Sequence, residues 1–333
     1  MKAYITSKEN LGKVKLIEKS ITYPQKRQVL IKILAVSLNR RDVRMIDGTY
    51  SFKFEWGQVL GADCCGQVIS CGGSVKKFKD GDFVVVNPNV NWGNTSEIPS
   101  SEYSILGSPK DGVFQEYIAV DESRVFYKPN HLSIEQASCI PLTGLTAYRA
   151  LFVKAKSVQN DALFIPGISG NVSQMLLKFA KAIDMSIYVS SSKEESINRS
   201  ISNGAILGFN YKTDSLKKFC KRNNLRFDIV IDSIGGTNIN DYIDEMKQGG
   251  RIIVYGAMKG KAPNFDLFSL YYNQISILGT LMGNDSEFES MLNFVSNYTI
   301  IPTIDKVFAF NDIDIAFSRL RNNENYGKIV LKF

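Results

Sequence analysis

The chain has 333 residues, 44% of them hydrophobic, with a net charge of +7 and five cysteines, an odd number. No apolar stretch is long enough to cross a bilayer, and Met1 to Lys8 alternates like a strand, unlike a signal peptide. Composition therefore excludes a membrane protein and a disulfide-stapled scaffold, and the dispersed lysines argue against nucleic acid as a partner. We expect a cytoplasmic protein of two domains that acts on a small-molecule substrate.

The first 120 residues are predicted to be mostly β-structure. Apolar runs separated by Gly, Asn, Asp and Pro turns predict strands at 29–36, 63–70, 82–86 and 114–120. This spacing is typical of a barrel-like domain. The polar segment 87–109, which contains Trp92 and Tyr103, is long enough to be either a functional lid or a disordered loop, and we expect a lid.

Helices are expected from Ser133 onward, where Ser133 and Gln136 have the spacing of a capping box. The apolar run from Ala162 then turns through Gly167 and Gly170 into an amphipathic helix. Gly167 allows a tight turn, Gly170 lets a pyrophosphate approach backbone N–H groups, and a small Ser173 keeps helix and strand close. This pattern predicts a dinucleotide cradle, although an ordinary strand-to-helix loop is the alternative for a lone glycine-rich turn.

The residues after the cradle favour the nucleotide-binding interpretation. Short β-branched runs at 186–193, 207–211, 227–236 and 250–256 alternate with helical stretches and predict a doubly wound parallel sheet. A helix at 287–295 and a strand at 327–333 follow. We therefore expect a β-rich domain over 1–124, an inserted Rossmann domain over 125–280, and a return to the first domain over 281–333.

Several motifs resemble those of the medium-chain dehydrogenase/reductase superfamily, in its zinc-free, quinone-oxidoreductase-like branch. They are 39–42 with 48–50, 60–63 with 66–68, 81–84, and 141–148. Segments 87–93, 104–107 and 277–283 look like a group of zinc-type alcohol dehydrogenase homologues. The resemblance implies an α/β fold in which a Rossmann sheet is inserted into a GroES-like barrel domain.

The residues that would hold a catalytic zinc are missing from this sequence. Zinc-dependent relatives have Cys where this chain has Asn39, and Gly-His-Glu where it has Gly61-Ala62-Asp63. Cys139 falls near the third ligand position, but one thiolate without a His partner makes no open tetrahedral site. We expect no metal, so simple alcohol oxidation is not the expected reaction.

The expected cofactor is NADPH. An Asp or Glu at the end of the second Rossmann strand would select NADH, whereas this chain has Ser190 to Lys193 there, whose hydroxyls and ammonium suit a 2′-phosphate. A merely polar helix start is the alternative. The resemblance adds Tyr211 to this pocket and places small or apolar residues around the nicotinamide. The complete expected cofactor site is Thr143, Gly167, Ser169, Gly170, Asn171, Val172, Ser191, Ser192, Lys193, Tyr211, Ser233, Ile234, Gly256, Leu278, Gly279 and Met282.

Catalytic residues are harder to assign. Tyr50 is a candidate proton donor, Asn39 a candidate hydrogen-bond donor to developing negative charge, and Asp42 a third candidate. Each has a structural alternative: Asn39 and Asp42 as braces of a loop after a strand, Tyr50 as a packing aromatic. Trp92 is expected to contact substrate, with the acceptor between the domains.

The expected reaction is hydride transfer to a quinone or a conjugated carbonyl. An enoyl or alkenal reductase is the neighbouring alternative, and a non-catalytic NADPH sensor or RNA-binding protein is the alternative from another class. The resemblance also implies a homodimer joined through the apolar segment 273–279.

Overall fold

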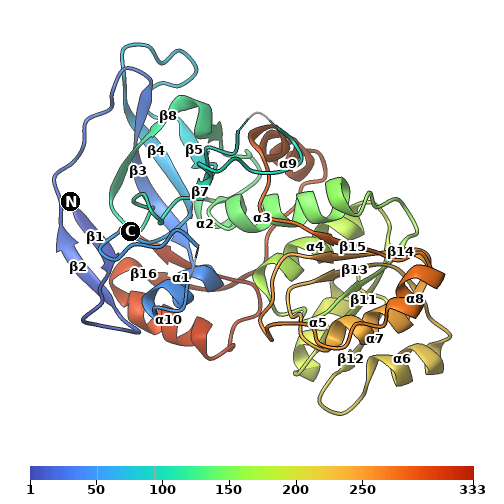
Figure 1. Cartoon of the computed structure of the whole chain (residues 1–333). Coiled ribbons are helices and arrows are strands. Elements are labelled where there is room, and N and C mark those ends of the chain that lie inside the picture. The colour runs from blue at the N-terminus through green and yellow to red at the C-terminus, as the bar shows by residue number, and fades with distance from the viewer. Residues whose placement is uncertain (51, 94) are drawn as a thin grey trace. The chain divides into compact units, whose positions relative to one another are not determined.

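The computed structural model describes residues 1–50, 52–93 and 95–333, which form two compact units (Figure 1). The first unit contains Met1–Leu145 and Gly283–Phe333, and the second contains Thr146–Met282. The chain leaves the first unit within helix α3 (Pro141–Tyr148), which continues into the π-helical segment η2 (Arg149–Lys154). The second unit is thus an insertion in the first, as the sequence pattern predicts.

The first boundary differs from the expected position at residue 124. Residues 125–145 belong to the first unit, because β9 (Val125–Tyr127) pairs antiparallel with β5 (Phe83–Val86). The short helix α2 (Ile134–Ala137) follows, and its predicted capping box is confirmed by hydrogen bonds in both directions between Ser133 and Gln136. A helix start therefore does not mark the domain boundary in this chain.

The main sheet of the first unit has strand order β16-β17-β3-β4-β5-β9 over the described residues, with β8 also paired to β3. The central strand β3 (Gln28–Ser37) pairs with β8 (Tyr117–Asp121) through its first half and with β17 (Lys328–Lys332) through its last three residues. Strand β4 (Asp63–Cys71) runs antiparallel along the opposite edge of β3. The remaining elements are β1 (Lys2–Thr6), β2 (Val14–Glu18), α1 (Arg40–Ile46), η1 (Glu122–Arg124), α9 (Asp285–Asn297), β16 (Ile304–Ala309), η3 (Phe310–Asp312) and α10 (Ile313–Arg321).

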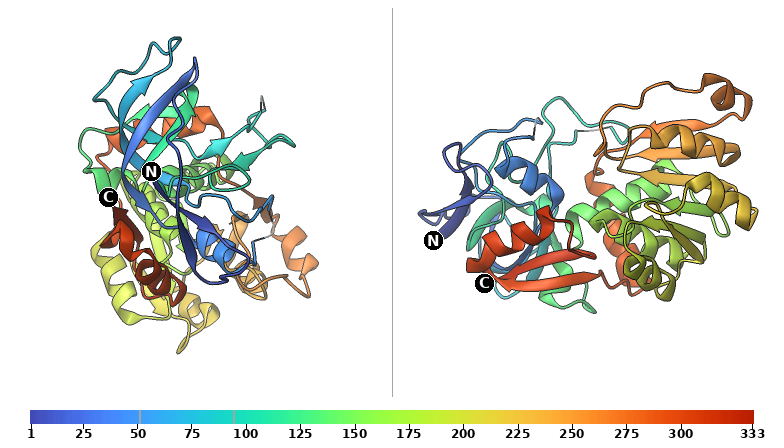
Figure 2. Two further views of the ribbon diagram at one scale, coloured as in Figure 1. Left: turned by 90° about the vertical axis from the view of Figure 1, so that its left-hand side faces the viewer. Right: turned by 90° about the horizontal axis from the view of Figure 1, so that it is seen from below.

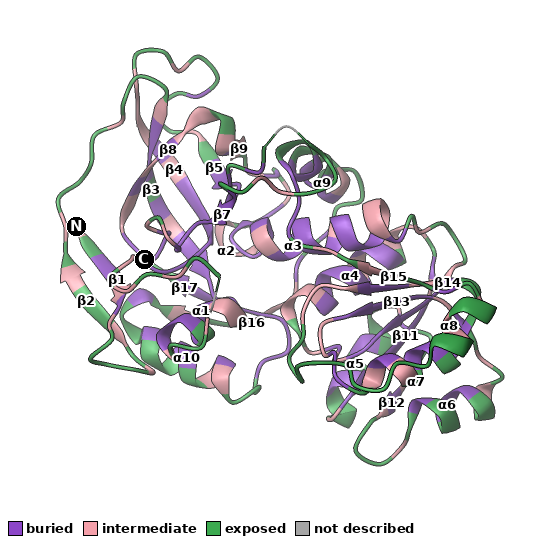
Figure 3. Ribbon diagram, viewed as in Figure 1, coloured by how far each residue is buried: buried purple, intermediate pink, exposed green. Residues whose placement is uncertain are grey.

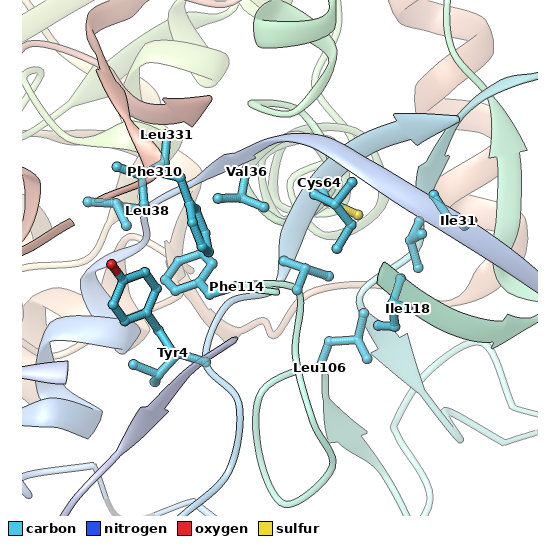
Figure 4. Packing of buried hydrophobic residues seen from close by; sticks show 14 of the residues in the cluster. Tyr4, Ile31, Val36, Leu38, Cys64, Leu106, Phe114, Ile118, Phe310 and Leu331 are labelled. Carbon is cyan, nitrogen blue, oxygen red and sulfur yellow. The ribbon is translucent and has the colours of Figure 1, made fainter. Parts of the chain in front are cut away.

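An apolar core fills the first unit (Figure 4). It combines side chains from the N-terminal strands with others from the C-terminal segment, for example Val36 and Leu38 with Phe310 and Leu331. Burying each large apolar side chain contributes about 1.5–3 kcal/mol. The C-terminal segment is therefore an integral part of this unit.

Segment 87–109 is ordered in its described residues, and Asn94 lies outside them. The segment contains a two-stranded hairpin of β6 (Asn89–Val90) and β7 (Ser104–Ile105). Asn87 and Asn89 donate side-chain hydrogen bonds to the Asp285 carboxylate of α9, at 2.7 and 3.3 Å. These contacts oppose the disordered alternative and anchor the segment to its own unit.

The second unit has one parallel sheet with strand order β12-β11-β10-β13-β14-β15 in the described residues (Figures 1 and 2). Numbered from β10, this order is 3-2-1-4-5-6, that of a dinucleotide-binding Rossmann fold. Its elements are β10 (Ala162–Ile165), α4 (Asn171–Ala182), β11 (Ser186–Ser191), α5 (Glu194–Ser202), β12 (Leu207–Asn210), α6 (Leu216–Asn223), β13 (Phe227–Asp232), α7 (Asn238–Asp244), β14 (Met246–Val254), α8 (Leu267–Tyr272) and β15 (Ser276–Gly279).

Both faces of this sheet are buried (Figure 3). Phe164 of β10 packs with Phe219 of α6 and Tyr242 of α7 in one apolar cluster. Its neighbours Leu163 and Ile165 point to the opposite face and are also fully buried. This burial explains why the strands are continuous apolar runs, and the predicted fold class is confirmed.

In the part of the chain that the structure describes, no helix combines the length and apolarity that crossing a bilayer requires. The five cysteines are free thiols, four of them buried.

Candidate functional site

The glycine turn after β10 has the geometry of an anion cradle. Gly167 has φ of +65°, a left-handed conformation that favours glycine, and its carbonyl accepts the Gly170 N–H at 3.0 Å. A Cβ on Gly170 would lie 3.3 Å from both the Gly167 carbonyl oxygen and Ser173 Oγ, so a side chain there is poorly accommodated. The turn is further held by Gln174 Nε2, which donates to the Ile168 carbonyl at 2.7 Å.

Helix α4 begins immediately after this turn. Its N-cap is Gly170, which offers no side-chain acceptor to the first-turn N–H groups. The helix start therefore has no side-chain cap, and the positive end of its dipole favours a negatively charged ligand. Ser173 is buried against the sheet, with Oγ 3.4 Å from the Tyr255 hydroxyl, as expected for a small residue between helix and strand.

Apart from Thr143, every residue predicted to bind the cofactor lies in the second unit. All six strands are parallel, so the residues at or just after their carboxyl ends gather on one edge of the sheet. One predicted residue lies beside this turn, since a Cβ on Gly167 would lie 3.5 Å from Ile234 Cδ1. Along the same edge, Gly256 lies against Ser233. The edge residues are Gly167, Ser169, Gly170, Asn171, Val172, Ser191, Ser192, Lys193, Tyr211, Ser233, Ile234, Gly256, Leu278 and Gly279, and Met282 closes the unit.

A group of hydroxyls marks the end of β11. Ser169 Oγ lies 3.0 Å from Ser196 Oγ and 3.5 Å from Ser191 Oγ, which ties the glycine turn to β11 and α5. Ser191 Oγ also accepts the Lys193 N–H at 3.2 Å, and the Lys193 side chain is exposed. The Tyr211 N–H donates to the Ser191 carbonyl, which places Tyr211 beside Ser191 in the pocket predicted for the 2′-phosphate. The end of β11 thus offers hydroxyls and an ammonium.

Asp232, which the sequence analysis did not single out, shapes the next turn. Its carboxylate accepts the Ile234 and Gly235 N–H groups at 2.9 and 2.8 Å and the Tyr242 hydroxyl at 3.2 Å. Burial raises the pKa of Asp232, while these donors oppose the shift. An Asp at a strand end before two glycines was the available signal. Asp232 therefore positions the turn that carries Ser233 and Ile234.

In the first unit, three adjacent strands bring together a buried polar cluster. Strand β17 pairs with β3 so that Val330 lies opposite Ser37, and β3 pairs with β4 so that Ser37 lies opposite Asp63. Extending this register places Lys328 beside Asn39. Lys328 Nζ donates to Asn39 Oδ1 at 2.9 Å and to Asp63 Oδ2 at 2.8 Å.

The Asn39 amide completes this cluster. Its Nδ2 donates to Asp63 Oδ2 at 2.8 Å, and Asn39 is only 3% exposed. The other carboxylate oxygen of Asp63 accepts the Leu142 N–H at 2.7 Å. Asn39 is thus held by two charged neighbours, which supports a positioning role. Direct contact of Asn39 with substrate remains a prediction.

Asp42 caps the start of α1. Its Oδ2 accepts the Asn39 N–H at 2.8 Å, while Oδ1 is buried without a protein partner in the described residues. Burial raises the pKa of Asp42 to about 6, partly offset by the nearby Arg41. These contacts favour the structural alternative, in which Asp42 braces the loop after β3.

Tyr50 and Trp92 lie in aromatic surroundings within the first unit. The Arg41 guanidinium lies 5.4 Å from the centre of the Tyr50 ring, and Phe54 packs edge-on against that ring. Trp92 is 3% exposed, packs edge-on against Tyr103, and donates its indole N–H to the Thr95 carbonyl at 2.9 Å. Trp92 therefore orders its own loop, and its contact with substrate remains a prediction.

Known proteins share both units. The family model of the alcohol dehydrogenase GroES-like domain matches residues 25–130, and that of zinc-binding dehydrogenases matches residues 172–297. The zinc-type alcohol dehydrogenase-like protein YogA of Leptosphaeria maculans is 31% identical over 332 residues, covering 93% of this chain and 91% of the relative. This chain belongs to the medium-chain dehydrogenase/reductase superfamily.

Other members of the superfamily extend this comparison. A quinone oxidoreductase of Lama guanicoe is 26% identical over 242 residues, covering 72% of this chain and 67% of the relative. The crystal structure of an NAD-dependent alcohol dehydrogenase superposes with a TM-score of 0.93 at 27% identity and covers the whole of both chains. The predicted superfamily is thus confirmed, and it includes both alcohol dehydrogenases and quinone oxidoreductases.

The donor set at the metal position of zinc-dependent superfamily members does not fit a metal ion. Asn39 and Asp63 direct oxygens at Lys328, and Ala62 has no donor atom. The Cys139 thiol donates to the Glu135 carbonyl at 3.2 Å, and burial raises its pKa to about 12. Among the residues that the structure describes, no group of three or more His, Cys, Asp or Glu side chains could hold a metal.

The zinc-binding family model does not alter this assignment. It matches residues 172–297, whereas Asn39, Ala62, Asp63 and Cys139 lie outside that range. The match covers most of the nucleotide-binding unit and continues into α9 of the first unit. No catalytic step of this superfamily member is therefore assigned to a metal.

Lys328 is the principal residue that the sequence analysis missed. The run Gly327 to Phe333 was predicted only as a strand. The available signal was a lysine at the start of an otherwise apolar strand, which is unusual because buried lysines need a partner. The partner Asp63 is 265 residues away in the sequence, so spacing alone did not reveal the pair.

Proposed function

We propose that this protein is a zinc-independent, NADPH-dependent oxidoreductase that reduces a quinone or a conjugated carbonyl compound. The observation that carries the proposal is the end of β11, where Ser191, Ser192 and Lys193 stand in place of the carboxylate that selects NADH. Charge-assisted hydrogen bonds to a 2′-phosphate contribute about 1.5–3 kcal/mol each.

The residues present fit the dinucleotide. The backbone N–H groups at the start of α4 are suited to the pyrophosphate, and the absence of a side chain at Gly170 lets it approach them. Ser233, Ile234 and Gly256 supply small or apolar surface for a flat ring. When bound, NADPH supplies a hydride. The chain's own contribution is to bind and orient the cofactor and to exclude water from it.

The proposed acceptors follow from the donor chemistry of the first unit. The ligand set does not fit a Lewis-acidic metal, so the substrate itself must delocalise the developing negative charge, as quinones and α,β-unsaturated carbonyls do. Tyr50 is the proposed proton donor or substrate-oxygen ligand. Tyr50→Phe tests that role: unchanged turnover would remove Tyr50 from the chemistry and leave water as the donor.

Calorimetric titration with NADPH and NADH tests the cofactor assignment. We expect NADPH to bind more tightly by at least about tenfold, equivalent to one charge-assisted hydrogen bond. A preference for NADH would overturn it. Oxidation of NADPH with a panel of 1,4-quinones and short enals then separates a quinone reductase from an enal reductase, and tight binding without turnover would favour a sensor.

We also propose a homodimer joined through the open edge of the Rossmann sheet. Strand β15 is the last strand in the described sheet, so one row of its backbone groups faces outward. Next to it, α8 buries none of its residues, and four large side chains of this helix are more than 60% exposed (Figure 3). They are Leu267, Phe268, Tyr271 and Tyr272. A second copy related by a two-fold axis would cover this apolar surface and pair the two β15 strands.

Light scattering at micromolar concentration tests the assembly. We expect the mass of a dimer for the native chain and of a monomer for Phe268→Lys/Tyr272→Lys, with NADPH binding retained. Tyr298→Lys, which changes an exposed tyrosine in the first unit, is the matched control. A monomeric native chain would refute the proposal. The free thiols support a reducing compartment, and we propose the cytoplasm.

A further inference from the structure

In the cluster of Lys328, Asn39 and Asp63, two side-chain oxygens surround a cation, and that cation is the ammonium group of Lys328. We propose that the Lys328 ammonium takes the place of the catalytic metal of zinc-dependent superfamily members and keeps zinc out of this site. The inference deepens the zinc independence of the proposed function by naming the residue responsible for it.

The geometry places the ammonium against two of the former ligand positions, Asn39 and Asp63. Lys328 Nζ lies 2.9 Å from Asn39 Oδ1 and 2.8 Å from Asp63 Oδ2, and the amide and carboxylate are joined at 2.8 Å. The three side chains form a closed triangle. Lys328 is 2% exposed and Asp63 is 0% exposed, so water does not screen the pair.

The third position adjoins the same cluster. Cys139 packs with Ala35 and Val330, and Val330 is two residues along β17 from Lys328. Ala62, at the fourth position, is fully buried and immediately precedes Asp63. Two of the positions that correspond to metal ligands, Asn39 and Asp63, thus direct their oxygens at an ammonium.

Charge balance explains why a metal would be excluded. The carboxylate of Asp63 neutralises Lys328, and Asn39 and Ala62 carry no charge. A dication in the triangle would lie within a few ångströms of a buried ammonium, where repulsion is strong because the medium screens poorly. Zinc could enter only if the Lys328 side chain left the site, and that would remove the partner of Asp63.

A competing explanation is that the triangle only joins the three strands and that zinc is absent for want of ligands. The two explanations differ when the ligands are restored. In Asn39→Cys/Ala62→His, a Cys and a His join Cys139, which is a sufficient set of catalytic zinc ligands. If ligands alone are limiting, this variant binds zinc. If the ammonium excludes zinc, it does so only after Lys328 is also replaced.

The experiment compares three proteins: Asn39→Cys/Ala62→His alone, with Lys328→Met, and with Lys332→Met. Lys332 lies on the same strand, is more than half exposed and pairs with Glu135, so it is the matched control for loss of a lysine. Each protein is exposed to zinc, dialysed, and assayed for bound zinc by elemental analysis and for the unfolding midpoint with and without zinc.

We expect stoichiometric zinc and a zinc-dependent rise of the midpoint only with Lys328→Met, with zinc affinity raised roughly a hundredfold or more over the other two. Equal zinc in all three proteins, or none in any of them, would overturn the inference. If Lys328→Met unfolds the chain, adding Asp63→Asn removes the unpaired charge, and Cys, His and Cys remain for zinc.

Failure of the inference is distinguishable from failure of the proposed function. Stoichiometric zinc in the native chain would refute both the zinc-independent function and the role of Lys328. A zinc-free native chain that binds NADPH, combined with equal zinc in the three variants, would leave the proposed function intact and refute the role of Lys328. Lack of turnover by the native chain would not change the zinc measurements.

Discussion

The candidate sites of the two units are built from different parts of the polypeptide. In the Rossmann unit the cradle consists of backbone N–H groups, a left-handed Gly167 and the start of α4. In the first unit the site consists of side chains, with Lys328, Asp63 and Asn39 joined by hydrogen bonds and buried. The backbone site is sensitive to an added side chain, and the side-chain site is sensitive to a lost charge.

This difference has an energetic consequence. An empty backbone cradle costs the fold little because water can satisfy its donors. Water cannot replace a partner in a buried ion pair, because removing one partner leaves the other charge unpaired in a medium of low polarity. Mutations in the buried ion pair of the first unit should therefore affect stability first, and mutations in the backbone cradle of the Rossmann unit should affect binding first.

The largest effect is expected from Lys328→Met. The Asp63 carboxylate would be left buried without its counter-ion, which costs about 3–5 kcal/mol of unfolding free energy. Denaturant unfolding followed by tryptophan fluorescence measures it, because both tryptophans, Trp56 and Trp92, lie in the first unit. Lys332→Met, which breaks a partly exposed pair, should cost no more than about 1 kcal/mol. Equal losses in the two variants would refute this contrast.

The second effect is a pH dependence of stability from Asp42. Burial raises its folded pKa from 3.8 to about 6, so the native state holds a proton that the unfolded state releases. The Asp42 contribution is therefore full below pH 3.8 and is lost as pH rises through 6, by roughly 3 kcal/mol at 1.36 kcal/mol per pKa unit.

Asp42→Asn isolates this contribution, because an amide oxygen can still accept the Asn39 N–H. The difference between the two unfolding curves should grow from pH 4 to pH 6.5 in favour of the variant. A constant difference across this range would show that Asp42 is ionised in the folded protein.

The third effect separates stability from binding in the Rossmann unit. Gly170→Asp puts a carboxylate at the N-cap of α4, where it occupies the first-turn N–H groups and repels a pyrophosphate. We expect NADPH affinity to fall roughly 10- to 100-fold while the unfolding midpoint of the Rossmann unit stays within a few degrees. Gly170→Ala adds the same Cβ without the charge and is the control. A loss of equal size in both variants would indicate crowding in place of charge.

The smallest effect concerns cofactor choice. Lys193→Glu replaces an exposed ammonium at the end of β11 with a carboxylate. NADPH affinity should fall by about tenfold or more, the value of one charge-assisted hydrogen bond, while NADH affinity should be unchanged. Lys217→Glu, an equally exposed lysine on α6, controls for net charge. An equal loss for both coenzymes would count against a 2′-phosphate site at Lys193.

Local patterns predicted most of the fold. The apolar runs of the Rossmann unit were recognisable because parallel strands buried on both faces are continuously apolar. The boundary was predicted at residue 124, whereas β9 pairs with β5 and so belongs to the first unit. Val125 pairs with Val86, and the sequence around residue 124 contains no local signal of so distant a partner. The order of segment 87–109, which has a buried Trp92 and an Asn87 anchored by Asp285, depends on tertiary contacts, and its role as a lid stays a prediction.

The sequence by itself determined the nucleotide-binding unit, because the glycines, the strand ends and the helix start that form the cradle lie within a few residues of one another and act through local backbone geometry. Only the tertiary structure decided the first unit's site. Asn39, Asp63 and Lys328 are brought together by the register of β3, β4 and β17, and the role of each depends on its two partners. The role of a single lysine in a C-terminal strand cannot be predicted from the sequence, because it depends on the carboxylate that the lysine neutralises in the folded protein.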